Sequence, residues 1–314
     1  MSRRSLVFGT ADRSHAPGPR RSRRGSDSAI LLRSDEPSGG ARALLHHQET
    51  ALKSRSCGWL LGCAAQLTIA SIAHAQGFWL IPVGDSIEAC AGVRFARCVR
   101  EVDPDRIVEA SAVTIAGRRP LRVVGSRGPV VMFTTDVLAR GIIYAVATLE
   151  PERLQRSAAD FNDYLRRAGL AQVYDLRERR GQLDRPAVER SQQFAKLLWR
   201  RAGWGSMGAR PVSHRFEIVP LADPAALHAG DTLAVEVRFE GHPLAGLPFT
   251  VGYAGAASPS FTAVTNSNGR VRVPIKHGGL WHLDSVYMRE AREEVVDWES
   301  FSASLTFAVR PPTN

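Results

Sequence analysis

Short apolar runs separated by turn residues dominate the chain after residue 76, and this pattern is typical of β-strands. Two runs, 128–135 and 141–148, are rich in β-branched residues. Seven more follow Pro211 at a spacing that favours a β-sandwich of immunoglobulin-like or transthyretin-like kind. Alternation supports this prediction, because every second residue from Leu233 to Phe239 is apolar and lies on one face. The seven runs are 215–221, 231–240, 247–255, 261–266, 269–276, 279–288 and 301–309.

A helical period interrupts the strands after residue 150. Leu154, Ala158, Phe161 and Leu165 recur at intervals of four, three and four, which predicts a helix that ends at Gly169. The arginines of this segment are expected on its exposed face.

A second helix is predicted from Asp184 to Gly203. Asp184 is a candidate N-cap, Pro186 falls in the first turn, and Phe194 and Leu198 are four residues apart. We expect the two helices to form an antiparallel pair that is inserted in, or packed on, the first β domain.

These patterns predict a mainly β protein of two domains. Residues 76–204 are expected to form an N-terminal β domain with the helical pair, and residues 213–310 a C-terminal β-sandwich. A glycine-rich linker at 205–212 lies between them. The length of 314 residues agrees with two modest domains.

The segment 53–75 has the three parts of a secretory signal peptide: a cationic start, an apolar stretch and an A-x-A cleavage site that ends at Ala75. The alternative is a retained transmembrane helix, but the apolar stretch is shorter than a membrane span and contains polar residues. Cleavage would make Gln76 the first residue and place the protein in the periplasm. Residues 1–52 are interpreted as disordered, or as lying before the true start of translation.

Composition limits the class of protein. Values of 44% hydrophobic and 23% charged residues exclude a fully disordered chain, a collagen-like repeat and a multi-span membrane protein. The net charge of +10 does not indicate nucleic-acid binding, because the first 75 residues hold 11 Lys or Arg against 5 Asp or Glu. No nucleophile stands in a constrained turn, so we predict a non-enzymatic protein, and no small-molecule substrate is identified.

Cys90 and Cys98 are the two cysteines that remain after signal cleavage. In an oxidising compartment, an even pair favours a disulfide over a metal or catalytic role. The alternative is two separately buried thiols.

Five histidines follow residue 76, and none has the HxH or HExxH spacing of common metal sites. His282 and Asp284 are two residues apart in a predicted strand and therefore share a face. We interpret them first as a surface hydrogen bond and second as part of a metal site. His277 is five residues from His282, which places it on the other face unless Gly278-Gly279 breaks the strand.

Several segments resemble a family of exported bacterial proteins that carries a domain of unknown function. They include the signal junction with Phe78-Trp79, the FNDYLRRAGL and ERSQQFAKLL segments, TNSNGRVRVPIKHGGLWHL and the closing DWESFSASLTF. The likeness covers residues 74–310. The family is often described as an accessory of nickel or cobalt uptake, so the resemblance implies a periplasmic, non-enzymatic metal-binding protein that works beside membrane metal-transport components.

The resemblance also implies two histidine ligands, one directly after the cleavage site and one in the strand that here contains Tyr287. Gln76 and Tyr287 stand at those positions, and neither an amide nor a phenol replaces imidazole well as a nickel ligand. Two hypotheses follow. In the first, the protein serves nickel or cobalt uptake, either with other ligands such as His282, Asp284 and His277 or by binding the transporter. In the second, it is a metal-independent binding or scaffolding module of the envelope.

Overall fold

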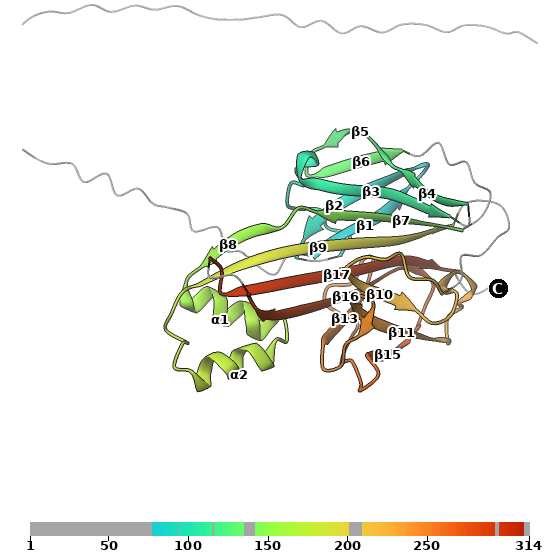
Figure 1. The fold of residues 1–314 in the computed structure, drawn as a ribbon. Coiled ribbons are helices and arrows are strands. Elements are labelled where there is room, and N and C mark those ends of the chain that lie inside the picture. The colour runs from blue at the N-terminus through green and yellow to red at the C-terminus, as the bar shows by residue number, and fades with distance from the viewer. Residues whose placement is uncertain are drawn as a thin grey trace, which may run out of the picture. The chain divides into compact units, whose positions relative to one another are not determined.

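The computed structural model describes residues 77–93, 95–114, 116–134, 142–200, 209–292 and 295–310 of the chain. They form a mainly β fold in which three sheets are stacked and two short helices cover one end of the central sheet (Figure 1). None of the helices in these ranges is long and apolar enough to cross a membrane. The predicted leader, the signal peptide and most of the predicted linker lie outside the described residues.

The central sheet has nine strands, and β9 and β17 at its middle are parallel while the other neighbours are antiparallel. Its order is β14 (Phe261–Val264), β13 (Pro248–Tyr253), β16 (Gly279–Glu290), β17 (Trp298–Val309), β9 (Ala187–Arg200), β7 (Ile142–Leu149), β3 (Ile107–Thr114) and β4 (Gly117–Pro120), with β8 (Glu152–Arg156) paired to β9. The long strands β9, β16 and β17 therefore bring segments that are far apart in the sequence into one sheet.

A smaller sheet packs on each face of the central sheet. One has the order β1 (Gly77–Val83), β2 (Ser86–Gly92), β6 (Val130–Thr134) and β5 (Arg122–Arg127). The other has β10 (Phe216–Pro220), β11 (Thr232–Phe239) and β12 (His242–Pro243), with β15 (Arg270–Pro274) paired to β11. Two short 3-10 turns lie at Pro104–Arg106 and Pro224–Ala226.

Strand β9 supplies side chains to both of the resulting cores. Ala195 and Leu197 are buried against the β1–β2 sheet, whereas Phe194 and Leu198 are buried against the β10–β11 sheet. Alternate residues of a strand point to opposite faces, so a strand between two layers carries apolar residues on both faces, as Phe194, Ala195, Leu197 and Leu198 do here.

The helices are α1 (Ala158–Arg167) and α2 (Ala171–Arg179). Helix α1 confirms the first predicted helix from Ala158 on, whereas Leu154, which was placed in the same apolar stripe, lies on strand β8. The Ser157 hydroxyl accepts the Asp160 backbone N–H at 3.1 Å and so caps the start of α1. Gly169 ends the turn after α1 with φ +71, and a Cβ there would come within 3.0 Å of Pro248 on β13. The absence of a side chain at Gly169 therefore allows the end of α1 to lie close to the central sheet.

The second predicted helix is wrong, because residues 187–200 form strand β9 rather than a helix. Phe194 and Leu198 are four residues apart, which places them on one face of a helix and equally on one face of a strand. Hydrogen-bonded neighbours on both sides, β17 and β7, decide between the two and override local helix propensity. The helical pair is instead α1 and α2.

The seven strands predicted after Pro211 are all present, and Trp79, Trp281 and Trp298 are buried as expected of core residues. The domain organisation differs from the prediction. Strands from 77–204 and from 213–310 share one sheet, and their side chains share one core. The described chain therefore has no independent sandwich core after residue 213.

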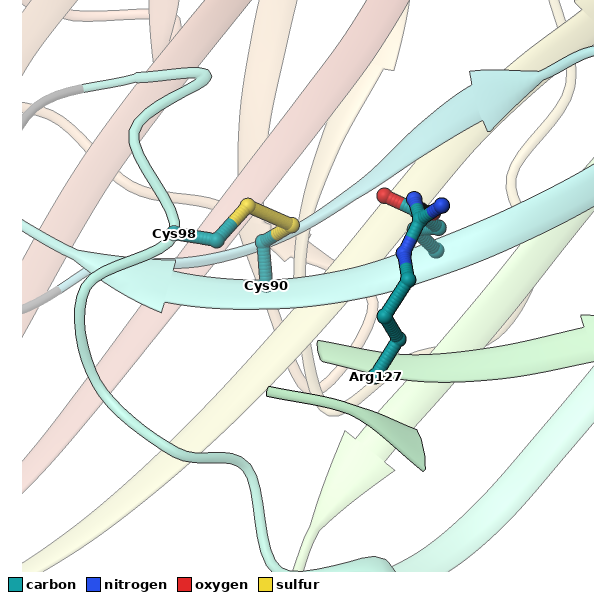
Figure 2. The surroundings of a disulfide bond; sticks show 4 residues. Cys90, Cys98 and Arg127 are labelled. Carbon is teal, nitrogen blue, oxygen red and sulfur yellow. Dashed lines mark hydrogen bonds and ion pairs between the residues drawn. A yellow bond between two sulfur atoms is a disulfide. The ribbon is translucent and has the colours of Figure 1, made fainter. Parts of the chain in front are cut away.

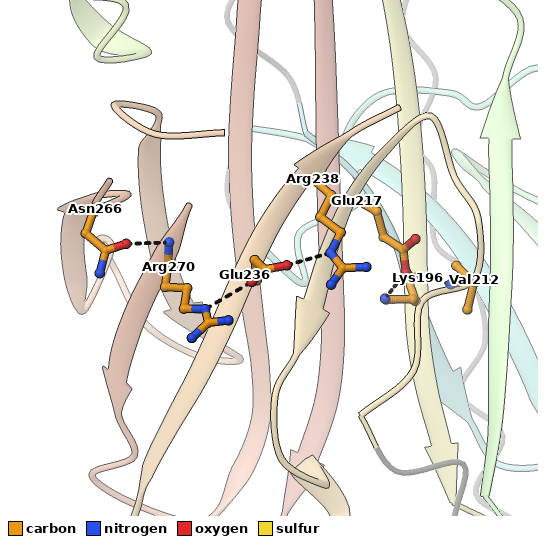
Figure 3. Close-up of polar contacts among 7 residues, drawn as sticks. All are labelled: Lys196, Val212, Glu217, Glu236, Arg238, Asn266 and Arg270. Carbon is orange, nitrogen blue, oxygen red and sulfur yellow. Dashed lines mark hydrogen bonds and ion pairs between the residues drawn. The ribbon is translucent and has the colours of Figure 1, made fainter. Parts of the chain in front are cut away.

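One ion pair lies inside the core between β9 and β10 (Figure 3). The ammonium group of Lys196 is 2.6 Å from Oε1 of Glu217, and that oxygen also accepts the Val212 backbone N–H at 2.8 Å. Burial of Lys196 lowers its pKa, and the Glu217 charge opposes that effect. Glu236 on β11 instead lies between the partly exposed Arg238 and Arg270, as Figure 3 also shows.

Candidate functional site

A cavity of about 420 Å³ lies on the face of the central sheet that carries the β1–β2 sheet and the helices. Its floor is the β13–β16 pair, one wall is formed by β1 and the loop after β2, and the end of α1 forms the rim. Side chains that line it include Trp79, Phe95, Arg167, Thr250, His282 and Asp284. A space of this size is in the range of small-ligand pockets.

The alternation of β16 points His282 into this cavity. Trp281 and Leu283 lie on the opposite face, in the core with β10 and β11. The His282 ring is stacked on Phe95, with ring centroids 4.5 Å apart, and meets the edge of Trp79. Burial lowers the pKa of His282 to about 3, so the imidazole is neutral at physiological pH. Its Nδ1 is buried and has no hydrogen-bond partner among the described residues.

Asp284 follows two residues later on the same face and is partly exposed to the cavity. Burial by the surrounding protein raises the pKa of its carboxyl to about 7. The indole N–H of Trp79, across from His282, is also buried without a partner in the described part of the chain. Buried polar groups in folded proteins are normally paired. The two unpaired groups, on His282 and Trp79, both belong to residues that line the cavity, which makes it the candidate ligand site.

The loop that carries Phe95 is closed by a disulfide between Cys90 and Cys98, which confirms the predicted bond (Figure 2). Cys90 on β2 is directly opposite Trp79 on β1, and the two pack with Phe95 in a small core. The disulfide thus holds the aromatic wall of the cavity against His282. Arg127, also seen in Figure 2, donates to the carboxylate of Glu88 at 2.6 Å.

Replacing Cys90 and Cys98 together by serine is expected to lower the free energy of unfolding by about 2 to 3 kcal/mol, because the short loop is no longer closed in the unfolded chain. Urea denaturation measures the change. Fully reduced wild-type protein should have the same midpoint as the double variant. Equal stability of the variant and the oxidised wild type would contradict the stabilising role.

Sequence comparison shows the family of the chain. The profile of a domain of unknown function, DUF4198, matches residues 73–289. The chain belongs to the DUF4198 family. Trp79 on β1 and His282 and Asp284 on β16 all lie inside this match, so the DUF4198 domain contains the floor and the aromatic wall of the cavity. None of the curated proteins matches the sequence significantly.

Comparison of the DUF4198 chain with solved structures finds matches of low identity. A tetra-tandem repeat from the extending region of a large adhesion protein is 13% identical, with 74% of this chain and 48% of that one covered and a TM-score of 0.18. The D0-D1 domain of intimin is 12% identical, with 73% and 96% covered and a TM-score of 0.18. The chain spans about half the length of the first.

The DUF4198 domain brings two of the predicted metal residues together and separates the others. His282 and Asp284 line the cavity, whereas His277 does not, because its ring is stacked on Trp281 and meets Tyr253 edge to face. Among the described residues, no three His, Cys, Asp or Glu side chains are grouped as a complete metal site.

The two positions named by the family resemblance differ in their relation to the cavity. Tyr287 lies on the opposite face of β16, where it packs on Phe239 and Phe301. A histidine at 287 would therefore not reach His282. Gln76 and the cleavage site at Ala75 lie outside the described residues, but Gly77, the next residue in the sequence, lines the cavity.

The lining residues that the sequence does not predict include Trp79, Phe95 and Arg167. Trp79 reads as an ordinary core residue, and it is indeed buried. Arg167 reads as one of several arginines on an exposed helix face. The position of Phe95 within the disulfide loop was the one available signal, since a closed loop holds its side chains in place.

Proposed function

We propose that this protein is a periplasmic, non-enzymatic accessory of transition-metal uptake, which binds nickel or cobalt in the cavity at His282 and Asp284. The observation that carries the proposal is the pair itself: a neutral imidazole with an unpaired buried nitrogen, and a carboxyl group that lines the same cavity. Imidazole nitrogen is a ligand that suits nickel and cobalt, and carboxylate oxygen can complete such a site.

The position of Gly77 on the cavity wall supports a third donor. Cleavage after Ala75 would leave the α-amine of Gln76 one residue from Gly77 in the chain. An amine, an imidazole and a carboxylate together suit a borderline metal ion. Cyclisation of an N-terminal glutamine to a lactam would remove the basic amine, so we expect modest affinity in the natural sequence.

The export signal and the family resemblance support the remaining parts of the proposal. A protein that binds metal after export would act beside membrane metal-transport components, which are its proposed partners. The alternative, a metal-independent binding or scaffolding module of the envelope, is favoured by Gln76 and Tyr287, which replace the two histidines implied by the family.

The test is nickel binding by the full mature chain, recovered from the periplasm. Its intact mass first establishes where the signal is cleaved. Calorimetry should detect binding at neutral pH, and His282→Leu should weaken it at least tenfold. Gln76→His should tighten it at least tenfold, because it adds an imidazole next to Gly77. His228→Leu, the same change at an exposed histidine, is the control and should have no effect.

Equal nickel affinity in the wild type and in His282→Leu would overturn the proposed site. Absence of nickel and cobalt binding in both the wild type and Gln76→His would favour the metal-independent module instead.

A further inference from the structure

We propose that the cavity binds its metal ion as a complex with a small organic chelator, and that Arg167 binds a carboxylate of that chelator. This inference rests on the proposed function and names the form in which the metal is bound. It follows from the size of the cavity, the number of donors on its walls and the charge at its rim.

The cavity is larger than a metal ion needs. A water molecule takes up about 30 Å³, so an ion with six waters fills roughly 200 Å³. The cavity measures about 420 Å³, twice as much. Small organic ligands are bound in pockets of this size.

The walls offer few metal donors and much apolar surface. In the described part of the chain, His282 and Asp284 are the only side chains with strong metal-ligating atoms that line the cavity. The remaining wall is formed mainly by rings and small side chains, among them Trp79, Phe95, Pro248 and Ala257. Most of the coordination positions of a nickel ion would therefore be filled by the bound ligand rather than by these walls.

Arg167 at the end of α1 is the one cation among the described lining residues. Its guanidinium now lies 3.2 Å from Asp163, which also holds Arg166 at 2.6 Å. Arg167 can therefore turn toward a ligand while Asp163 keeps Arg166 as a partner. A guanidinium at the rim of an apolar cavity is suited to a carboxylate, which it can bind through two parallel hydrogen bonds.

Nickel citrate is the probe for this inference. A site for the bare ion loses nickel when citrate is added, because citrate competes for the metal. A site for the complex retains nickel and citrate in a one-to-one ratio. We expect the full mature chain to bind the complex at least tenfold more tightly than nickel alone, with both components measured after gel filtration.

Two variants test the named contacts. Arg167→Gln should weaken binding of nickel citrate at least tenfold and leave binding of nickel alone unchanged, whereas Arg166→Gln, its neighbour outside the cavity, should change neither more than twofold. Gly252 is opposite His282 on β13, and a Cβ there meets nothing within 4 Å. Gly252→Leu should therefore fill the cavity and exclude the complex while the thermal unfolding transition is kept.

The outcomes separate the inference from the proposed function. If citrate abolishes nickel binding, the inference that the cavity binds a metal chelate is overturned, whereas the proposed metal site is not. Equal losses in Arg167→Gln and Arg166→Gln would overturn the role of Arg167. Failure to bind either nickel or nickel citrate, also after Gln76→His, would overturn the proposed function itself.

Discussion

Replacing Lys196 by methionine is expected to lower the free energy of unfolding by about 3 to 5 kcal/mol. Lys196 is 1% exposed, and its ion pair with Glu217 lies inside the core between two sheets. Methionine fills much of the same space but carries no charge. The Glu217 carboxylate would then stay buried with the Val212 N–H as its remaining donor in the described structure. Chemical denaturation at neutral pH measures the loss.

A second substitution distinguishes an unpaired charge from lost packing. Glu217→Gln added to Lys196→Met removes the remaining charge, and the amide oxygen can still accept from Val212. The double variant should therefore recover most of the stability. Arg180→Met, which breaks an exposed ion pair with Glu290, is the control and should cost less than about 1 kcal/mol. A loss in Lys196→Met no larger than in the control would contradict the prediction.

Acid is expected to destabilise the wild type more than the variant His214→Leu, by about 3 kcal/mol at pH 4 relative to pH 7.5. His214 is 7% exposed, and its ring packs on Phe194. Burial lowers its pKa to about 3, and the nearby charges of Lys196 and Arg118 add to the effect. Leucine has a similar volume and cannot be protonated.

The direction of this pH dependence follows from the number of protons that the folded and the unfolded state bind. Below the unfolded pKa of about 6.5 the unfolded chain takes up a proton on this histidine, whereas the folded protein does so only near pH 3. Stability is therefore complete above pH 6.5 and falls as the pH drops toward 3. Urea denaturation at several pH values should give a shallower dependence for His214→Leu. The exposed position His228→Leu serves as the control and should keep the wild-type dependence.

Local pattern alone was sufficient for helix α1 and for the seven strands predicted after Pro211. Alternating apolar residues mark strands such as β11, and the apolar stripe with Gly169 at its end marks α1. Such signals are short-range, because the period of side chains along a strand or helix is set by the backbone itself. The same period places His282 and Asp284 on one face of β16.

Tertiary pairing decided what local pattern left ambiguous. The segment 187–200 is compatible with a helix and with a strand, and it becomes β9 because β17 and β7 offer hydrogen bonds on both sides. The same pairing joins the two predicted domains in one sheet. Sequence spacing carries no information about a partner more than 100 residues away, such as Trp298 opposite Glu189.

The cavity likewise has some features that the sequence determines and others that only the tertiary structure decides. The sequence determined the signal-like leader, the cysteine pair and the shared face of His282 and Asp284. Only the tertiary structure placed Trp79, Phe95 and Arg167 around that face, and only it separated Tyr287 and His277 from the cavity. The reason is physical: which side of a strand a residue occupies is a local property, whereas what covers that side depends on how the sheets and helices pack on one another.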